Sequence, residues 1–130
     1  MHWFTVLLIL AIFLYLVLPK LRQASLESAA QAIQDGAPLI DVRTAREFSQ
    51  QSVPGSLNMP LGQLKDALEE HDISTSSQIL VFCLSGTRSG VAERQMRAMG
   101  YRHILNIGSY GRAKKAWQLS QTKQGEGNKT

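Results

Sequence analysis

The sequence predicts a three-layer α/β domain with a mostly parallel sheet, preceded by one transmembrane helix. Between residues 22 and 118, short apolar runs alternate with helical patterns, which is typical of βαβ units in a parallel sheet. Residues 3–18 contain no charged side chain. The 130 residues leave room for one domain of roughly 100 residues and one further segment. We therefore expect an anchor at 1–21, a domain at 22–118 and a disordered tail at 119–130.

The predicted anchor matches a bilayer in length. As a helix, Met1 to Pro19 would measure roughly 28 Å, close to the roughly 30 Å hydrocarbon core. Lys20 and Arg22 follow the apolar run, and no Lys or Arg precedes it. This charge bias predicts a single-pass protein of the cell membrane, inserted through residues 3–18, with its C-terminal domain in the cytoplasm.

Two alternatives to an anchor are less consistent with the sequence. A cleaved signal peptide could end near Ala30-Gln31-Ala32, but it should begin with a basic segment and be cleaved close to its apolar run. A buried core helix should present a polar face to water, and this run has none.

The first half of the domain begins with a capped helix. Ser25 caps a helix at Leu26–Gln34, whose apolar residues recur at helical spacing before Gly36 ends it. The apolar run 38–42 predicts a buried strand, and 44–50 predicts one or two helical turns. Pro54-Gly55 predicts a turn, which is followed by a strand at 56–59 and a helix from 61 to 70.

The second half repeats the alternation. We expect a core strand at 79–82, a helix at 89–99 with Met96 and Met99 in the core, a strand at 103–107, and a last helix reaching Trp117. The tail lacks apolar residues after Ser120 and is predicted to be disordered.

Composition narrows the chemistry to one thiol. A single cysteine excludes an intramolecular disulfide and a cysteine-based zinc cluster. The net charge of +4 suits small anions or acidic lipids as well as it suits nucleic acid, and no nucleic-acid-reading motif is present. We expect no metal, no cofactor and no nucleic-acid partner.

Cys83 follows the strand predicted at 79–82 and precedes a helix. Ligands of open α/β sheets bind at the carboxyl ends of strands. A helix N-terminus and a nearby guanidinium both lower a thiol pKa. The small residues Ser85, Gly86 and Thr87 let backbone N–H groups converge above the sulfur. We therefore predict an anion-binding site built around a thiolate.

Three segments carry a family resemblance. The loop C-L-S-G-T-R at 83–88 resembles the C-x-x-G-x-R active-site loop of single-domain rhodaneses. D-V-R at 41–43 with E-F at 47–48 resembles their first-strand signature, and V-P-G-S at 53–56 with N-M-P at 58–60 resembles a second. The similarity covers residues 25–108. It departs at Gln51-Ser52 and at Gly108-Ser109, where relatives often have Gly-His and Gly-Gly.

The resemblance implies a three-layer rhodanese-like domain and a sulfurtransferase reaction. Cys83 would take a sulfane sulfur from a donor such as thiosulfate, become a persulfide, and pass the sulfur to a thiol or cyanide. The substrate-binding residues would be those of the loop: Leu84, Ser85, Gly86, Thr87 and Arg88. Arg88 would favour the thiolate, bind donor oxygens, or close the loop in an ion pair, for example with Asp41. Asp41, Arg43 and Glu47 would support the loop.

Two other interpretations of Cys83 are open. A lone cysteine that ends a core strand is most often a small buried apolar residue. A related fold contains cysteine phosphatases, whose C-x-x-x-x-x-R loop surrounds a phosphate. Here Arg88 comes five positions after the cysteine, and the sixth position is Ser89, so we expect negligible phosphatase activity.

A second functional hypothesis is a membrane-tethered sulfur carrier or interaction module that serves a membrane-protein partner. Six basic residues are candidates for a docking or lipid-facing patch, or for an ordinary solvated face: Arg94, Arg97, Arg102, Arg112, Lys114 and Lys115. His71 and His103 are expected to have no catalytic role. The physiological donor and acceptor and the oligomeric state do not follow from the sequence.

Overall fold

The computed structural model describes residues 1–21 and 23–127, without the side chains of residues 19 and 20. Four parallel strands form one sheet in the order β2-β1-β3-β4. The strands are β1 (Leu39–Asp41), β2 (Leu57–Asn58), β3 (Gln78–Cys83) and β4 (His103–Ser109). The predicted α/β class and parallel sheet are therefore confirmed.

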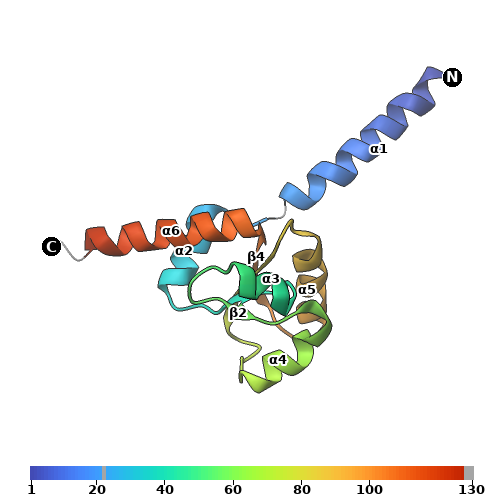
Figure 1. Cartoon of the computed structure of the whole chain (residues 1–130). Helices are drawn as coiled ribbons and strands as arrows, with labels where there is room; N and C mark the ends of the chain where they lie inside the picture. Colours follow the sequence, from blue (N-terminus) through green and yellow to red (C-terminus); the bar gives the residue numbers. More distant parts are fainter. Residues whose placement is uncertain (22, 128–130) are drawn as a thin grey trace.

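Helices cover both faces of the sheet (Figure 1). The elements on one face are η1 (Leu61–Gln63), α4 (Leu64–Glu70) and α5 (Thr87–Ala98); those on the other are α2 (Leu26–Gln34) and α6 (Tyr110–Gly127). The short helix α3 (Ala45–Gln50) follows β1. Strand β3 is buried from Ile79 to Cys83, as expected for a strand covered on both faces.

The predicted bounds of α2 agree with the structure at both ends, because the residues that begin and end this helix are distinctive in the sequence. The Ser25 side chain accepts a hydrogen bond from the Ser28 N–H, and the helix ends just before Gly36, whose φ is +84°. Met96 is fully buried in the core, and Met99 packs against it, as predicted.

The last helix is longer than predicted. Residues 119–127 are helical, and residues 128–130 lie outside the described residues. The Ser120 side chain is buried, and the Gln34 side chain donates a hydrogen bond of 2.9 Å to the Ser120 carbonyl. Packing against α2 therefore stabilises a polar segment that the sequence alone predicts to be disordered.

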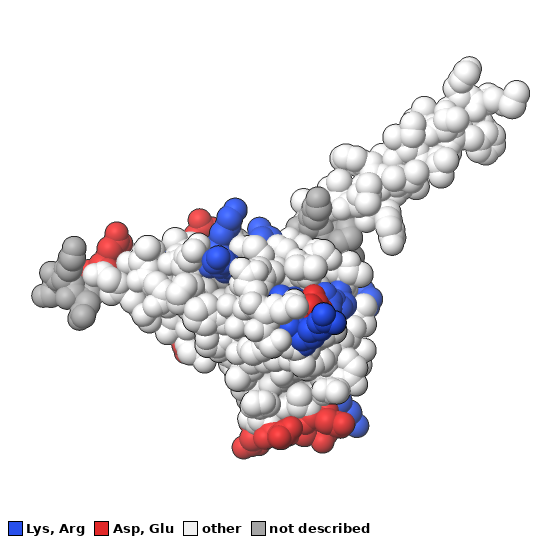
Figure 2. All heavy atoms as spheres, viewed as in Figure 1, with Lys and Arg blue, Asp and Glu red and all other residues white. Residues whose placement is uncertain are grey.

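The helix α1 (His2–Leu21) projects away from the domain (Figure 1). It presents no charged side chain to solvent over its described length (Figure 2), and its large apolar side chains are exposed.

Among the described residues, we find no helix both long and apolar enough to cross a membrane. The transmembrane anchor predicted at 1–21, and the single-pass localisation that followed from it, are thus not supported.

Candidate active site

The site lies where β3 ends and α5 begins. Cys83 is the last residue of β3, and Gly86 is the N-cap of α5. Gly86 has a φ of +103°, a left-handed conformation that glycine adopts without the Cβ penalty of other residues. This turn brings the first N–H groups of α5 back toward the sulfur, and the Gly86 N–H lies 3.0 Å from Cys83 Sγ.

The Cys83 thiol is buried, which by itself raises its pKa. Hydrogen bonds from the backbone N–H groups of Ser89, Gly86 and Ser85, and from the Ser89 hydroxyl, outweigh this effect and lower the pKa below its usual value. The arrangement therefore stabilises a thiolate. Because Cys83 is fully buried, neighbouring side chains must move before a substrate can reach the sulfur.

Ser89 is a residue of the site that was not predicted from the sequence. It lies in the first turn of α5 and is fully buried. Its hydroxyl oxygen lies 3.0 Å from the Gly86 carbonyl oxygen, and its single proton can be donated either to this carbonyl or to the Cys83 sulfur. Its position in the sequence could have predicted this role, because N–H groups in the first turn of a helix have no partner within the helix and are free to bind an anion.

The structure brings Arg88 together with Glu47, and not with Asp41. The Arg88 Nη1 and Nη2 atoms lie 2.6 Å and 3.0 Å from the two Glu47 carboxylate oxygens. This hydrogen-bonded pair lowers the pKa of Glu47 to about 2 and raises that of Arg88. Glu47 also accepts a hydrogen bond from the Thr44 N–H in the capping box of α3, so α3 and the loop are joined.

Asp41 and Arg43 form a second pair next to the loop. Asp41 is fully buried, and Arg43 is 4% exposed. The Arg43 Nε and Nη2 atoms lie 2.9 Å and 2.7 Å from Asp41 Oδ2, and Nη2 also donates to the Gln51 carbonyl at 2.7 Å. The Tyr110 ring lies under the guanidinium, 4.7 Å from its central carbon. The paired groups fix the chain that follows β1.

Strand β4 supplies the remaining wall of the site. A shift in register between β3 and β4 pairs Phe82 with Gly108 and Cys83 with Ser109. The Gln23 side chain packs on Gly108 so closely that a Cβ there would collide with it. The neighbouring Ala24 is tied to β4 through the Asn106 carbonyl at 2.9 Å. The connector from α1 thus lies against the loop, which the sequence did not indicate.

The predicted basic patch is not continuous. Arg94 and Arg97 belong to α5, whereas Arg112 and the two lysines belong to α6, on the opposite face of the sheet. Arg97 pairs with Glu93 at 3.0 Å. Arg112 donates to the Ile107 carbonyl at 2.9 Å and to the Ala24 carbonyl. Arg112 therefore supports the fold between α6, β4 and the connector.

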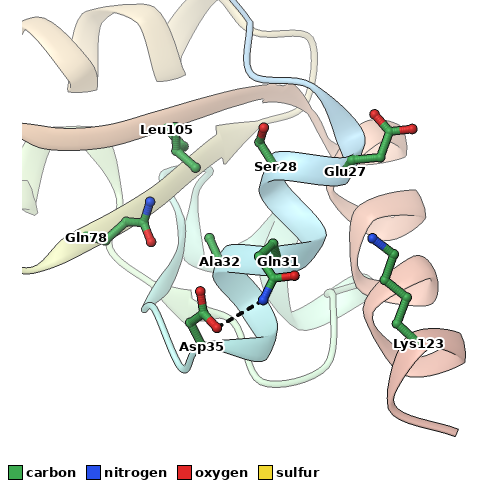
Figure 3. A pocket seen from close by; sticks show the side chains of 8 residues that line it. All are labelled: Glu27, Ser28, Gln31, Ala32, Asp35, Gln78, Leu105 and Lys123. Atoms are coloured by element: carbon green, nitrogen blue, oxygen red, sulfur yellow. Dashed lines mark hydrogen bonds between the residues drawn. The ribbon is translucent and has the colours of Figure 1, made fainter. Parts of the chain in front are cut away.

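A pocket of 530 Å³ lies away from the cysteine. It is lined from α2, α6 and the strands, and it includes Gln78, which is at the opposite end of β3 from Cys83 (Figure 3). Glu27, Asp35 and Lys123 give it charges of both signs, and Gln31 binds Asp35 at 3.1 Å. No residue of the 83–88 loop contributes to it, so we do not assign it to the Cys83 chemistry.

The fold and the cysteine loop define a small α/β protein with a cysteine at a strand end. The rhodanese-like domain family matches residues 25–120. The chain therefore belongs to the rhodanese-like domain family.

Relatives of this chain include proteins named for sulfur transfer. It is 33% identical over 69 residues to thiosulfate sulfurtransferase PspE of Escherichia coli, covering 53% of this chain and 66% of the relative. It is 30% identical to a putative sulfur carrier protein, YrkF, of Bacillus subtilis, covering 68% of this chain and 48% of the relative. The chain thus spans about half to two thirds of these two relatives.

A solved structure supports the same family. The human single-domain sulfurtransferase TSTD1 is 25% identical and superposes with a TM-score of 0.61, covering 75% of this chain and 96% of that structure.

Proposed function

We propose that this protein is a sulfurtransferase that moves sulfane sulfur through a Cys83 persulfide. The observation that carries the proposal is the 3.0 Å hydrogen bond from the Gly86 N–H to Cys83 Sγ, at the N-terminus of α5. The same donors that lower the thiol pKa would also stabilise the negative charge of a persulfide.

The reaction proceeds in two steps. The Cys83 thiolate attacks the sulfane sulfur of a donor such as thiosulfate; an S–S bond forms, and sulfite leaves with the electrons of the broken bond. A thiol or cyanide then attacks the outer sulfur, and the cysteine leaves as a thiolate. In this proposal the backbone of residues 84–88 binds the charged sulfur, and Glu47 holds Arg88 at the loop. The buried pair of Asp41 and Arg43 supports the wall behind it.

The test is formation of thiocyanate from thiosulfate and cyanide by the full chain. Wild-type protein is expected to turn over, and Cys83→Ser is expected to show only the uncatalysed rate. Ser76→Ala provides a control with unchanged rate, because Ser76 is exposed in the connector between α4 and β3 and lies outside the 83–88 loop. Equal rates for wild type and Cys83→Ser would contradict the proposal.

Phosphatase activity is expected to be absent. The loop has one residue fewer between cysteine and arginine than a C-x-x-x-x-x-R loop, and Arg88 is already bound to Glu47. Hydrolysis of an aryl phosphate should therefore remain at background. Turnover that disappears in Cys83→Ser would show that the loop accepts a phosphoryl group.

A second candidate function is delivery of sulfur to a protein partner. It is favoured by the exposed apolar surface of α1 and by the packing of the following connector against Gly108. A partner that binds α1 would be held on the same chain as the Cys83 loop, which raises its effective concentration there. In this case, Leu7→Ser and Phe13→Ser together should weaken transfer to that partner while thiocyanate formation is unchanged. Equal transfer by wild type and the double variant would exclude this role of α1.

A further inference from the structure

One apolar side chain is exposed beside the nucleophile. Within residues 23–127, the large apolar side chain that is well exposed is Leu84, at 55%. Its neighbour Cys83 is fully buried. Single exposed apolar residues are common on protein surfaces, but this one is adjacent in sequence to the cysteine that would carry sulfur.

The backbone holds Leu84 in place. Its carbonyl accepts a hydrogen bond of 3.3 Å from the Tyr110 N–H. On either side, Cys83 pairs with Ser109 in the sheet, and Ser85 forms a bridge to the same residue. The Leu84 side chain is thus presented from a fixed part of the loop, which reduces the entropy cost of contacting a substrate.

The cationic side chain of the loop is already paired. Both terminal nitrogens of Arg88 bind the Glu47 carboxylate, at 2.6 Å and 3.0 Å. An anionic substituent on a substrate would have to compete with this bidentate pair. The backbone N–H groups serve the reacting sulfur. The loop also exposes the hydroxyl side chains of Ser85 and Thr87, and Leu84 is the exposed side chain of the loop that offers an apolar contact to the rest of the substrate.

We propose that Leu84 is a specificity-determining residue that selects acceptor thiols with an apolar carbon group next to the sulfur. This inference rests on the proposed persulfide chemistry. The acceptor thiolate attacks the outer sulfur of the Cys83 persulfide and a new S–S bond forms. The bond to Sγ breaks with its electron pair on the cysteine, so no further oxidant or reductant is needed. The alkyl group of the acceptor lies against Leu84 during this attack.

The test measures discharge of the loaded persulfide in the full chain. Cys83 is loaded with polysulfide, excess donor is removed, and the rate of sulfur loss is followed by intact mass with 1-butanethiol, 2-mercaptoethanol or cyanide. Leu84→Ser is expected to slow discharge to butanethiol roughly tenfold, a typical loss for one apolar contact. Discharge to mercaptoethanol and cyanide should change less than about twofold. Leu84→Met should restore the preference for butanethiol.

Leu7→Ser is the matched control, because Leu7 is 56% exposed but lies on α1. It should leave all three rates unchanged. An equal slowing with every acceptor in Leu84→Ser, or no slowing with any, would overturn the role of Leu84. Failure of the wild type to load sulfur is a separate result, which would refute the proposed function itself.

Discussion

Two arginine–carboxylate pairs lie next to the Cys83 loop, and their environments differ. The Asp41–Arg43 pair is almost completely buried, whereas the side chains of Arg88 and Glu47 are 33% and 28% exposed. Breaking a buried pair leaves an uncompensated charge inside the protein, while a pair open to water is partly screened. The buried pair should therefore govern stability, and the partly exposed pair should govern the position of the loop.

The largest expected effect comes from removing one partner of the buried pair. Arg43→Met leaves the Asp41 carboxylate buried without its partner and should lower the free energy of unfolding by about 3–5 kcal/mol. Arg88→Met should cost less than about 1 kcal/mol. Urea unfolding of both variants measures the difference. Equal losses would contradict the division of roles between the two pairs.

A smaller effect is expected at the thiolate. Ser89→Ala removes the hydroxyl donor that helps to lower the Cys83 pKa, so that pKa should rise. Alkylation of Cys83 at pH 7 should slow by roughly three- to tenfold, with the pH profile displaced to higher pH. Because the thiol is buried, alkylation also depends on how easily the reagent reaches the sulfur. The alkylation rate at high pH, where Cys83 is ionised, measures this accessibility. A lower rate at every pH with an unshifted profile would indicate altered access instead.

The smallest effect concerns acid stability. The folded-state pKa of Glu47 is lowered from 4.5 to about 2. Its contribution to stability is therefore present above pH 4.5 and is lost as the pH falls toward 2. Glu47→Gln should reduce stability at pH 6 by less than about 1 kcal/mol and should flatten this part of the pH dependence. The matched control is Glu70→Gln at the exposed end of α4. If Glu47→Gln shows the same pH dependence of stability as the wild type, the Arg88–Glu47 pair is not the source of that dependence.

The sequence predicted the position of the Cys83 loop between a strand and a helix, because the requirements for this turn are local. The strand end, Gly86 and the first turn of α5 are contiguous, so spacing alone places their backbone N–H groups near Cys83. The partner of Arg88 depends on side-chain directions in α3, about 40 residues away, and spacing could not distinguish Glu47 from Asp41.

Tertiary contacts account for the other differences. The polar end of α6 becomes helical because it packs against α2, a contact that local composition does not report. The bond between the Ala24 N–H and the Asn106 carbonyl likewise joins distant segments. In α1 the apolar pattern predicted the helix correctly, whereas the membrane span inferred from it is not supported among the described residues.

The most direct test of the central claim is the intact mass of the full chain after incubation with thiosulfate, with Cys83→Ser treated alongside. We expect a gain of about 32 Da, one sulfur atom, in the wild type alone, reversed by cyanide or a thiol. No gain from thiosulfate or from a reactive polysulfide would contradict persulfide chemistry at Cys83. The chain would then be a rhodanese-like domain used for interaction and not for sulfur transfer.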